Sequence, residues 1–194
     1  MNATLEPSAT NSTATLWEID PVHSSAQFSV RHLMISNVKG EFTKVTGRFD
    51  GANIEQSSIE ASVDVNSIST REPARDAHLK SADFLDVANF PVMTFKSKRV
   101  VKNADGGVNL IGDLTIRATT REVTLTLDGP TPPIKDPWGN VRRGASASAK
   151  INRKDFGLTW NAVLETGGVV VGDEVSITLD VELVAQTTPT ASKN

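Results

Sequence analysis

The stretch SAQFSVRH, residues 25–32, separates its side chains into two sets when the chain is extended. The side chains on one face are Ala26, Phe28, Val30 and His32, and those between them are all polar. A period of two residues is typical of a β-strand, because successive side chains of a strand point to opposite sides. The stretch therefore predicts a strand that buries one face.

The same period recurs along the chain. SIEASVDV (58–65), VMTFKSKRVV (92–101) and VSITLDVELVA (175–185) alternate in the same way, and VKGEFTKVTGRF (38–49) alternates with a shift that indicates a bulge. Turn residues such as DGPTPP (128–133) separate the stretches. Eight or nine such strands predict an all-β fold, either an antiparallel barrel or a two-layer sandwich.

Composition limits the classes of function. The chain has 194 residues, 38% of them apolar, which is enough for one domain with a sizeable core. The formal net charge is −3 and no basic stripe is present, so no nucleic-acid partner is expected. The absence of cysteine excludes disulfides, thiolate metal sites and cysteine nucleophiles.

Both ends of the chain are polar. Residues 1–15 and 186–194 are rich in Thr, Ser, Asn and Ala, and we expect disordered tails there around one globular unit, 16–185. The N-terminus lacks the basic and apolar regions of a signal peptide, and no segment reaches the ~20 apolar residues of a membrane span. We therefore expect a cytoplasmic protein without an integral membrane segment, or a periplasmic one if a leader was removed.

One segment, RDAHLKSADFLDVANFP (75–91), departs from the period of two. At helical spacing, residues 74–85 form one contiguous, largely apolar face made of Ala74, Ala77, His78, Ala82, Phe84 and Leu85. Asp76 and Lys80 fall on the opposite face as an i,i+4 pair. The pattern predicts a short helix with Thr70 as its N-cap that ends before Pro91.

The three histidines do not form a recognisable site in the sequence. His78 has alanines at both i±4 positions, so helical spacing gives it neither a carboxylate nor a second histidine, and we expect it to face the sheet. It is either a hydrogen-bonded junction residue or a polar contact in a ligand cavity. His32 is either a core or a pocket residue, and His23 an exposed turn residue. No metal site and no catalytic residue are predicted.

Five blocks of the sequence resemble the YceI-like family, in the order in which that family has them. They span about Trp17 to Ala185, and they are WEIDPVHSSAQFSVRHLMISNVKGEF, RDAHLKSADFLDVANFP, GDLTIRATTREVTLTL, RKDFGLTWN and GDEVSITLDVELV. The resemblance implies an eight-stranded antiparallel, lipocalin-like barrel with a short helix near one opening. It also implies a binding protein without a cofactor, which stores or transports a long polyisoprenoid, an isoprenoid quinone precursor or a fatty lipid in the barrel.

The residue sizes agree with such a cavity. An eight-stranded barrel is just wide enough for side chains or one slim ligand, and the strand GASASAK (144–150) offers only small or Lys side chains on both faces. The barrel should therefore be incompletely filled. The predicted ligand-binding residues are Phe28, Val30, His32, Val38, Phe42, Phe49, Val63, Val65, His78, Ala82, Phe84, Leu85, Phe95, Leu114, Ile116 and Trp160.

Two other functions stay open at this level. A hydrolase or isomerase acting on a hydrophobic substrate would need a carboxylate within about 3 Å of a histidine inside the cavity. A structural protein would have a filled barrel with no void. Trp160 would either cover an opening or pack on Phe156, and Trp138 would be a turn aromatic. An exposed edge strand or an apolar barrel mouth would suit a homodimer.

Overall fold

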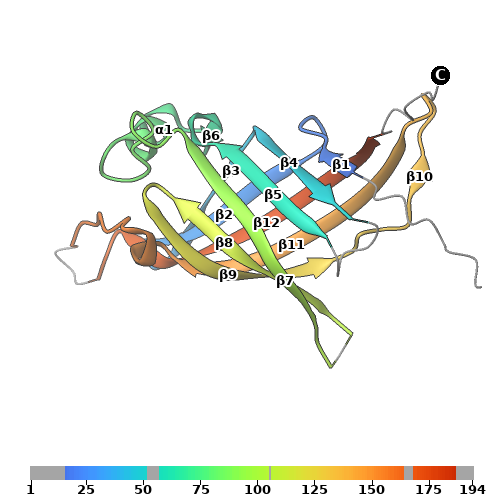
Figure 1. Ribbon diagram of the computed structural model, residues 1–194. Helices are drawn as coiled ribbons and strands as arrows, with labels where there is room; N and C mark the ends of the chain where they lie inside the picture. The colour runs from blue at the N-terminus through green and yellow to red at the C-terminus, as the bar shows by residue number, and fades with distance from the viewer. Residues whose placement is uncertain (1–15, 52–56, 105, 164–167, 187–194) are drawn as a thin grey trace, which may run out of the picture.

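The computed structural model describes residues 16–51, 57–104, 106–163 and 168–186 (Figure 1). The strands, in chain order, are β1 (Leu16–Ile19), β2 (Ser25–His32), β3 (Ser36–Phe42), β4 (Val45–Asp50), β5 (Ser58–Asp64), β6 (Ile68–Ser69), β7 (Val92–Lys102), β8 (Val108–Ile116), β9 (Thr119–Asp128), β10 (Ile134–Lys135), β11 (Val141–Asn152) and β12 (Val171–Gln186). The helical elements are α1 (Pro73–Lys80) and two 3₁₀ turns, η2 (Val65–Ser67) and η3 (Arg153–Phe156). The expected disordered tails, 1–15 and 186–194, lie outside the described residues except for Gln186, which ends β12.

The strands close into a barrel in which all neighbours are antiparallel. β12 pairs with β11 along one edge and with β2 and then β1 along the other, so β1 and β2 act as one strand interrupted at residues 20–24. β3 and β4 form a second interrupted strand, because β3 pairs with β2 and β4 pairs with β1. The ring continues through β5, β7, β8 and β9, and three residue pairs between β9 and β11 complete it.

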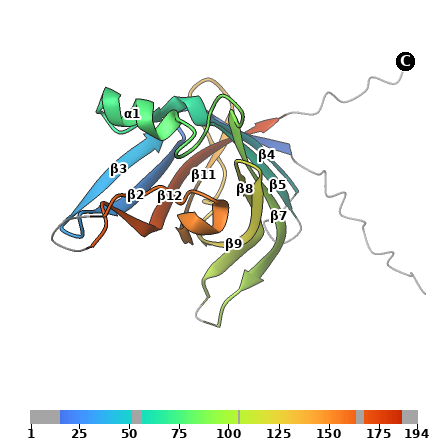
Figure 2. The same ribbon diagram turned by 90° about the vertical axis from the view of Figure 1, so that its left-hand side faces the viewer.

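Counted in this way the ring has eight strands, since β1/β2 and β3/β4 each count once. The predicted eight-stranded antiparallel barrel with one short helix is therefore confirmed. The interruption between β3 and β4 lies at Thr43 and Lys44, inside the stretch where the sequence indicates a bulge. Both α1 and η3 lie at one end of the barrel, and β10 lies at the other end (Figures 1 and 2).

The helix is shorter than predicted, and its N-cap is different. Glu72 caps α1, because its carboxylate accepts hydrogen bonds from the backbone N–H groups of Ala74 and Arg75. After Lys80, Ser81 turns the chain out of the helix by donating to the carbonyl of His78 from both its N–H and its hydroxyl. The prediction of one continuous helix through residue 85 was therefore wrong.

The roles of Thr70 and Asp76 also differ from the prediction. The carboxylate of Asp76 accepts hydrogen bonds from the N–H and the hydroxyl of Thr70, at 2.8 and 2.5 Å. Arg75 donates back to the hydroxyl and the carbonyl of Thr70. Asp76 is therefore tied to the chain before the helix and is half-buried, whereas an exposed pair with Lys80 was expected. This link holds α1 against the end of the barrel.

The apolar core has a main part at the helix end and two smaller parts, one at the opposite end and one formed by Leu110, Leu125 and Ala147 of β8, β9 and β11. Phe84 and Leu85, which follow the helix, are buried at the helix end together with Phe156. Trp17, Phe49 and Leu183 pack together at the opposite end. In the described part of the chain, no helix is long and apolar enough to cross a bilayer.

Candidate functional site

A cavity of about 320 Å³ runs inside the barrel. Every strand of the ring contributes to its wall, and along β12 the lining residues extend from Val171 to Leu183. Twelve residue steps at ~3.3 Å correspond to about 40 Å along the strand. The cavity is therefore long and narrow, and its exposed lining is apolar. The expected void inside the barrel is confirmed.

The small residues of β11 make room for this cavity. Ala145, Ala147 and Ala149 alternate with polar residues, and all three line the cavity. Their neighbours across the ladder on β12 are larger and also line it; they are Val181, Leu179 and Ile177. A barrel of eight strands normally fills its interior with side chains. Three alanines in succession on one wall leave part of that interior empty.

Ten of the sixteen predicted ligand-binding residues line the cavity. They are Phe28, Val30, Phe42, Phe49, Val63, Phe84, Leu85, Phe95, Leu114 and Ile116. The eight of them that lie in strands are on the inward face that the alternation indicates, whereas Phe84 and Leu85 reach the cavity from the turn after α1. Contact between these residues and a ligand remains a prediction.

The other six predicted residues do not line the cavity. Val65 lies in η2, where the 3₁₀ turn interrupts the alternation of β5, and it is 1% exposed in the core. His32 and Val38 are half-buried near the turn that joins β2 to β3, and neither lines the cavity. Ala82 is exposed in the turn after α1. The remaining two, His78 and Trp160, belong to an aromatic group beside the cavity.

This aromatic group consists of His78, Phe84 and Trp160. The His78 ring meets the rings of Phe84 and Trp160 edge-on, with centroids 5.0 and 4.8 Å apart, and Phe84 and Trp160 are 5.1 Å apart. Phe84 also lines the cavity, so the group forms the outer side of the wall at the helix end. Trp160 therefore contacts the rings of α1 and the turn that follows it.

His78 has an acidic partner that its helical spacing did not predict. Its Nε2 lies 3.0 Å from Oδ2 of Asp83, because the chain leaves the helix after Lys80 and the turn brings Asp83 back toward the ring. The expectation that His78 faces away from the acids was therefore wrong. The side chains of His78 and Asp83 are 41% and 54% exposed, and neither lines the cavity.

Arg153, at the start of η3, is a buried cation that the sequence analysis missed. It is 4% exposed, and all five of its N–H donors have acceptors. These acceptors are the carbonyls of Gly172, Leu158, Trp160 and Val171 and the carboxylate of Asp173. Burial lowers the pKa of the guanidinium, and Asp173 acts in the opposite direction. Since no donor is free, Arg153 fixes the loop and the start of β12 at the helix end.

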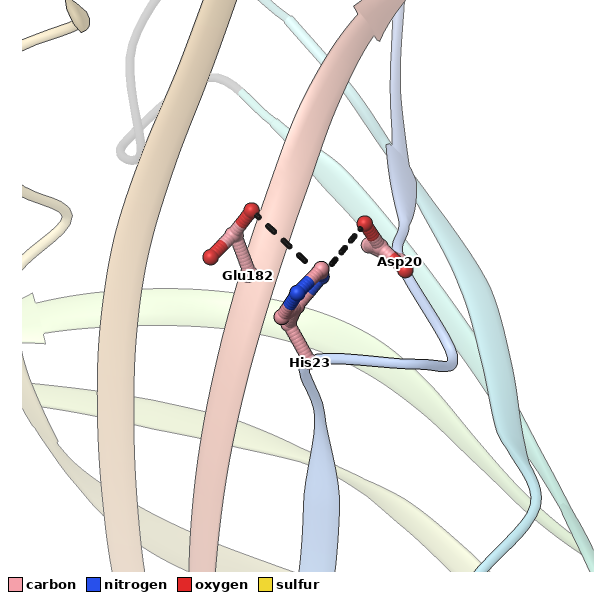
Figure 3. A group of neighbouring side chains, drawn as sticks. All are labelled: Asp20, His23 and Glu182. Carbon is pink, nitrogen blue, oxygen red and sulfur yellow. Dashed lines mark hydrogen bonds and ion pairs between the residues drawn. The ribbon is translucent and has the colours of Figure 1, made fainter. Parts of the chain in front are cut away.

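A second polar group, Asp20, His23 and Glu182, lies on the outside of the barrel (Figure 3). The ligand atoms of these three residues lie within 4.8 Å of one another, a spacing at which side chains can hold a metal ion. Nδ1 of His23 is 3.0 Å from Oδ2 of Asp20 and 4.0 Å from Oε1 of Glu182. As expected for a turn residue, His23 is exposed.

Arg142 donates hydrogen bonds to both carboxylates of this group. Its Nη1 donates to Oδ2 of Asp20 at 2.7 Å and to Oε1 of Glu182, and its Nε donates to Asp136 at 2.7 Å. The bond from Arg142 is the main reason why the pKa of Asp20 lies well below its usual range. Burial alone would raise the pKa of Asp136, but bonds from Arg142 and Asn140 lower it to about 2. The network therefore ties the interruption between β1 and β2 to β12 and to Asp136, and its three carboxylates outnumber its cations.

Comparisons with known proteins identify the family. The family model described as the YceI-like domain matches residues 17–183. A UPF0312 protein of Staphylococcus aureus is 36% identical over 173 residues, covering 87% of this chain and 96% of that protein. The crystal structure of the Campylobacter jejuni YCEI protein is 28% identical with a TM-score of 0.67, covering 80% of this chain and 90% of that one.

A third comparison concerns the fold alone. The structure described as a polyisoprenoid binding domain from Saccharophagus degradans is 12% identical, with a TM-score of 0.64, covering 88% of this chain and 98% of that one. Its barrel is similar although little of the sequence is shared. Because the family model matches nearly all of the described barrel, the chain belongs to the YceI-like family.

Proposed function

We propose that this protein binds a long-chain polyisoprenoid, or a similar amphiphilic lipid, inside the barrel and serves in its storage or transport. The observation that carries this proposal is the apolar cavity that follows β12 from Val171 to Leu183. The Saccharophagus domain described as polyisoprenoid binding has a similar fold, which supports the proposal.

The cavity favours an extended hydrocarbon chain over a compact ligand. Its lining extends about 40 Å along the strand, and its width is that of an eight-stranded barrel. At ~0.3 kcal/mol for each non-hydrogen atom, a chain of about 40 carbons would gain on the order of 12 kcal/mol. That corresponds to a dissociation constant in the nanomolar range without any ion pair.

The residues of the cavity wall favour binding over catalysis. Among the described residues that line it there is no histidine, aspartate, glutamate or lysine, so the wall supplies no general acid or base. Two arginines line the cavity. The donors of Arg153 are already used by five acceptors, and Nη2 of Arg48 donates to the carboxylate of Glu60 at 2.8 Å.

An enzyme with a pocket histidine would need its histidine and carboxylate inside the cavity. His78 and Asp83 have the required distance of 3.0 Å, but both are half-exposed and lie outside the lining. The histidine and carboxylate that the hydrolase or isomerase hypothesis requires therefore lie outside the apolar cavity.

The test is to extract the purified protein with organic solvent and to identify apolar compounds by mass spectrometry. Two variants on adjacent positions of β11 make the test specific. Ala147→Phe places a ring in the cavity, whereas Ser148→Phe places the same ring on the outer face, because Ala147 is buried against the cavity and Ser148 is exposed.

We expect the native protein and Ser148→Phe to carry a long apolar chain in stoichiometric amount, or to take up an added polyprenol. Ala147→Phe should carry at least about tenfold less. Equal amounts in the two variants would place the ligand outside the cavity. A native protein that neither carries an apolar compound nor takes up the polyprenol would contradict the proposal.

A further inference from the structure

The turn between β2 and β3 combines a strained backbone with exposed apolar side chains. Leu33 and Met34 have φ angles of 50° and 61°, and Ile35 closes the turn with a hydrogen bond of 3.1 Å from its N–H to the carbonyl of His32. Two successive positive φ angles are normally supplied by Asn-Gly, since other side chains raise the energy of this conformation. Met34 and Ile35 are nevertheless 56% and 77% exposed.

This turn lies at the helix end of the barrel, next to the end of the cavity. The N–H of Leu33 donates to the carbonyl of Val170 at 2.9 Å, and the next residue, Val171, lines the cavity. Val170 in turn donates to Ala162, which precedes Val163, a valine that is 85% exposed. Three apolar side chains, those of Met34, Ile35 and Val163, are thus presented to solvent where the cavity reaches the end of the barrel.

Two cations lie just behind the turn. Arg31 and Lys39 are exposed residues of β2 and β3, on the face that points away from the barrel interior. The structure gives neither of them an ion pair with any residue that it describes. An apolar tip with unpaired cations behind it matches a membrane surface, where hydrocarbon lies beneath anionic headgroups.

We propose that the tip formed by Leu33, Met34 and Ile35 docks on an anionic lipid bilayer, and that the ligand passes there between the bilayer and the cavity. The proposal rests on the proposed function, because it assigns the surface through which that ligand enters. A protruding turn offers no groove for a peptide or for a second barrel, whereas its side chains can insert among lipid chains. The strained conformation is then retained because it presents apolar residues at the tip.

The test is co-sedimentation of the full-length protein with sucrose-loaded vesicles of phosphatidylcholine containing about one-quarter phosphatidylglycerol. The variant Met34→Gly/Ile35→Thr removes the two exposed apolar side chains of the tip and places glycine at a positive φ. It should bind the vesicles about tenfold or more weakly, while its melting temperature stays equal or rises. Arg31→Ser/Lys39→Ser should weaken binding by about fivefold or more for each cation removed.

The matched control removes exposed apolar side chains from the opposite end of the barrel. Ile134 and Trp138 are 66% and 82% exposed there, in and beside β10. Ile134→Thr/Trp138→Ser should bind the vesicles like the native protein. If this control lost binding instead, or if the native protein failed to bind the vesicles, the proposed docking surface would be wrong.

A second measurement separates this proposal from the proposed function. Uptake of a polyprenol added from ethanol, without vesicles, should be the same for the native protein and Met34→Gly/Ile35→Thr, whereas uptake from loaded vesicles should be slower for the variant. Equal uptake from vesicles would refute the docking surface and leave cavity binding intact. Loss of uptake by the native protein under both conditions would instead refute cavity binding.

Discussion

Replacing Arg153 by methionine should destabilise the protein strongly, although Arg153 lies in a short 3₁₀ turn. Methionine keeps much of the length of the side chain but has no donor. Four backbone carbonyls and one carboxylate then lose their hydrogen bonds. The loop after η3 and the start of β12 would lose the group that joins them.

The size of the effect follows from these acceptors. The bond from Arg153 to the carbonyl of Leu158 is buried, so leaving this carbonyl without a donor should cost about 1–3 kcal/mol of stability. Losing the bond to each of the three half-buried carbonyls should cost about 0.5–1.5 kcal/mol. Asp173 is 42% exposed, and water can replace its lost partner. We therefore expect the free energy of unfolding to fall by about 3–6 kcal/mol. At about 2–4 °C for each kcal/mol, the melting temperature should fall by at least about 6 °C.

The neighbouring residue provides the control for this prediction. Lys154 binds the same Asp173 at 2.8 Å, but its side chain is 48% exposed. Lys154→Met should therefore lose at most about 1 kcal/mol. Thermal unfolding followed by circular dichroism compares the two variants directly. If Arg153→Met and Lys154→Met melted within about 2 °C of each other, the hydrogen bonds of Arg153 would not be the source of stability proposed.

Two further predictions test other parts of the barrel. A Cβ on Gly40 would lie 2.4 Å from Cζ of Phe28, so Gly40→Ala should lower the free energy of unfolding by about 1–3 kcal/mol in a denaturant titration. In the control Gly144→Ala, the new Cβ meets no atom nearer than 3.9 Å, so the free energy of unfolding should not change. Equal losses in the two variants would contradict this packing. Because the pKa of Asp136 is lower in the folded protein than its usual value of 3.8, its contribution to stability is complete above about pH 4 and is lost as the pH falls toward 2. Between pH 5 and pH 2, the melting temperature of Asp136→Asn should therefore fall less steeply than that of the native protein. Parallel curves for the two proteins would show that the bond from Arg142 does not stabilise the ionised carboxylate.

The features that depend on local periodicity could be predicted from the sequence. The alternation in residues 25–32 gave the strand β2 with the correct bounds and placed Phe28 and Val30 on the cavity face. The small residues of β11 indicated an incompletely filled barrel, because their size alone limits what the wall can occupy.

The features that depend on turns and distant partners were missed. The helical spacing of His78 could not show that the chain leaves the helix at Ser81 and returns Asp83 to its ring. Arg153 resembled an ordinary surface cation, because its carbonyl acceptors reach as far as Gly172 and only the folded loop brings them together. A charged residue directly after the alternation of β11, inside the block RKDFGLTWN, was the available signal.

The number of paired residues differs from one seam of the barrel to the next. Eleven residue pairs join β11 to β12, whereas only three, from Thr126 to Asp128 on β9, join β11 to β9. Local opening is easiest where the fewest hydrogen bonds must break. The seam between β9 and β11 is therefore the one that opens most easily, and thermal fluctuations that widen the bore begin there. Widening at this seam enlarges the bore while the longer ladder between β11 and β12 stays intact.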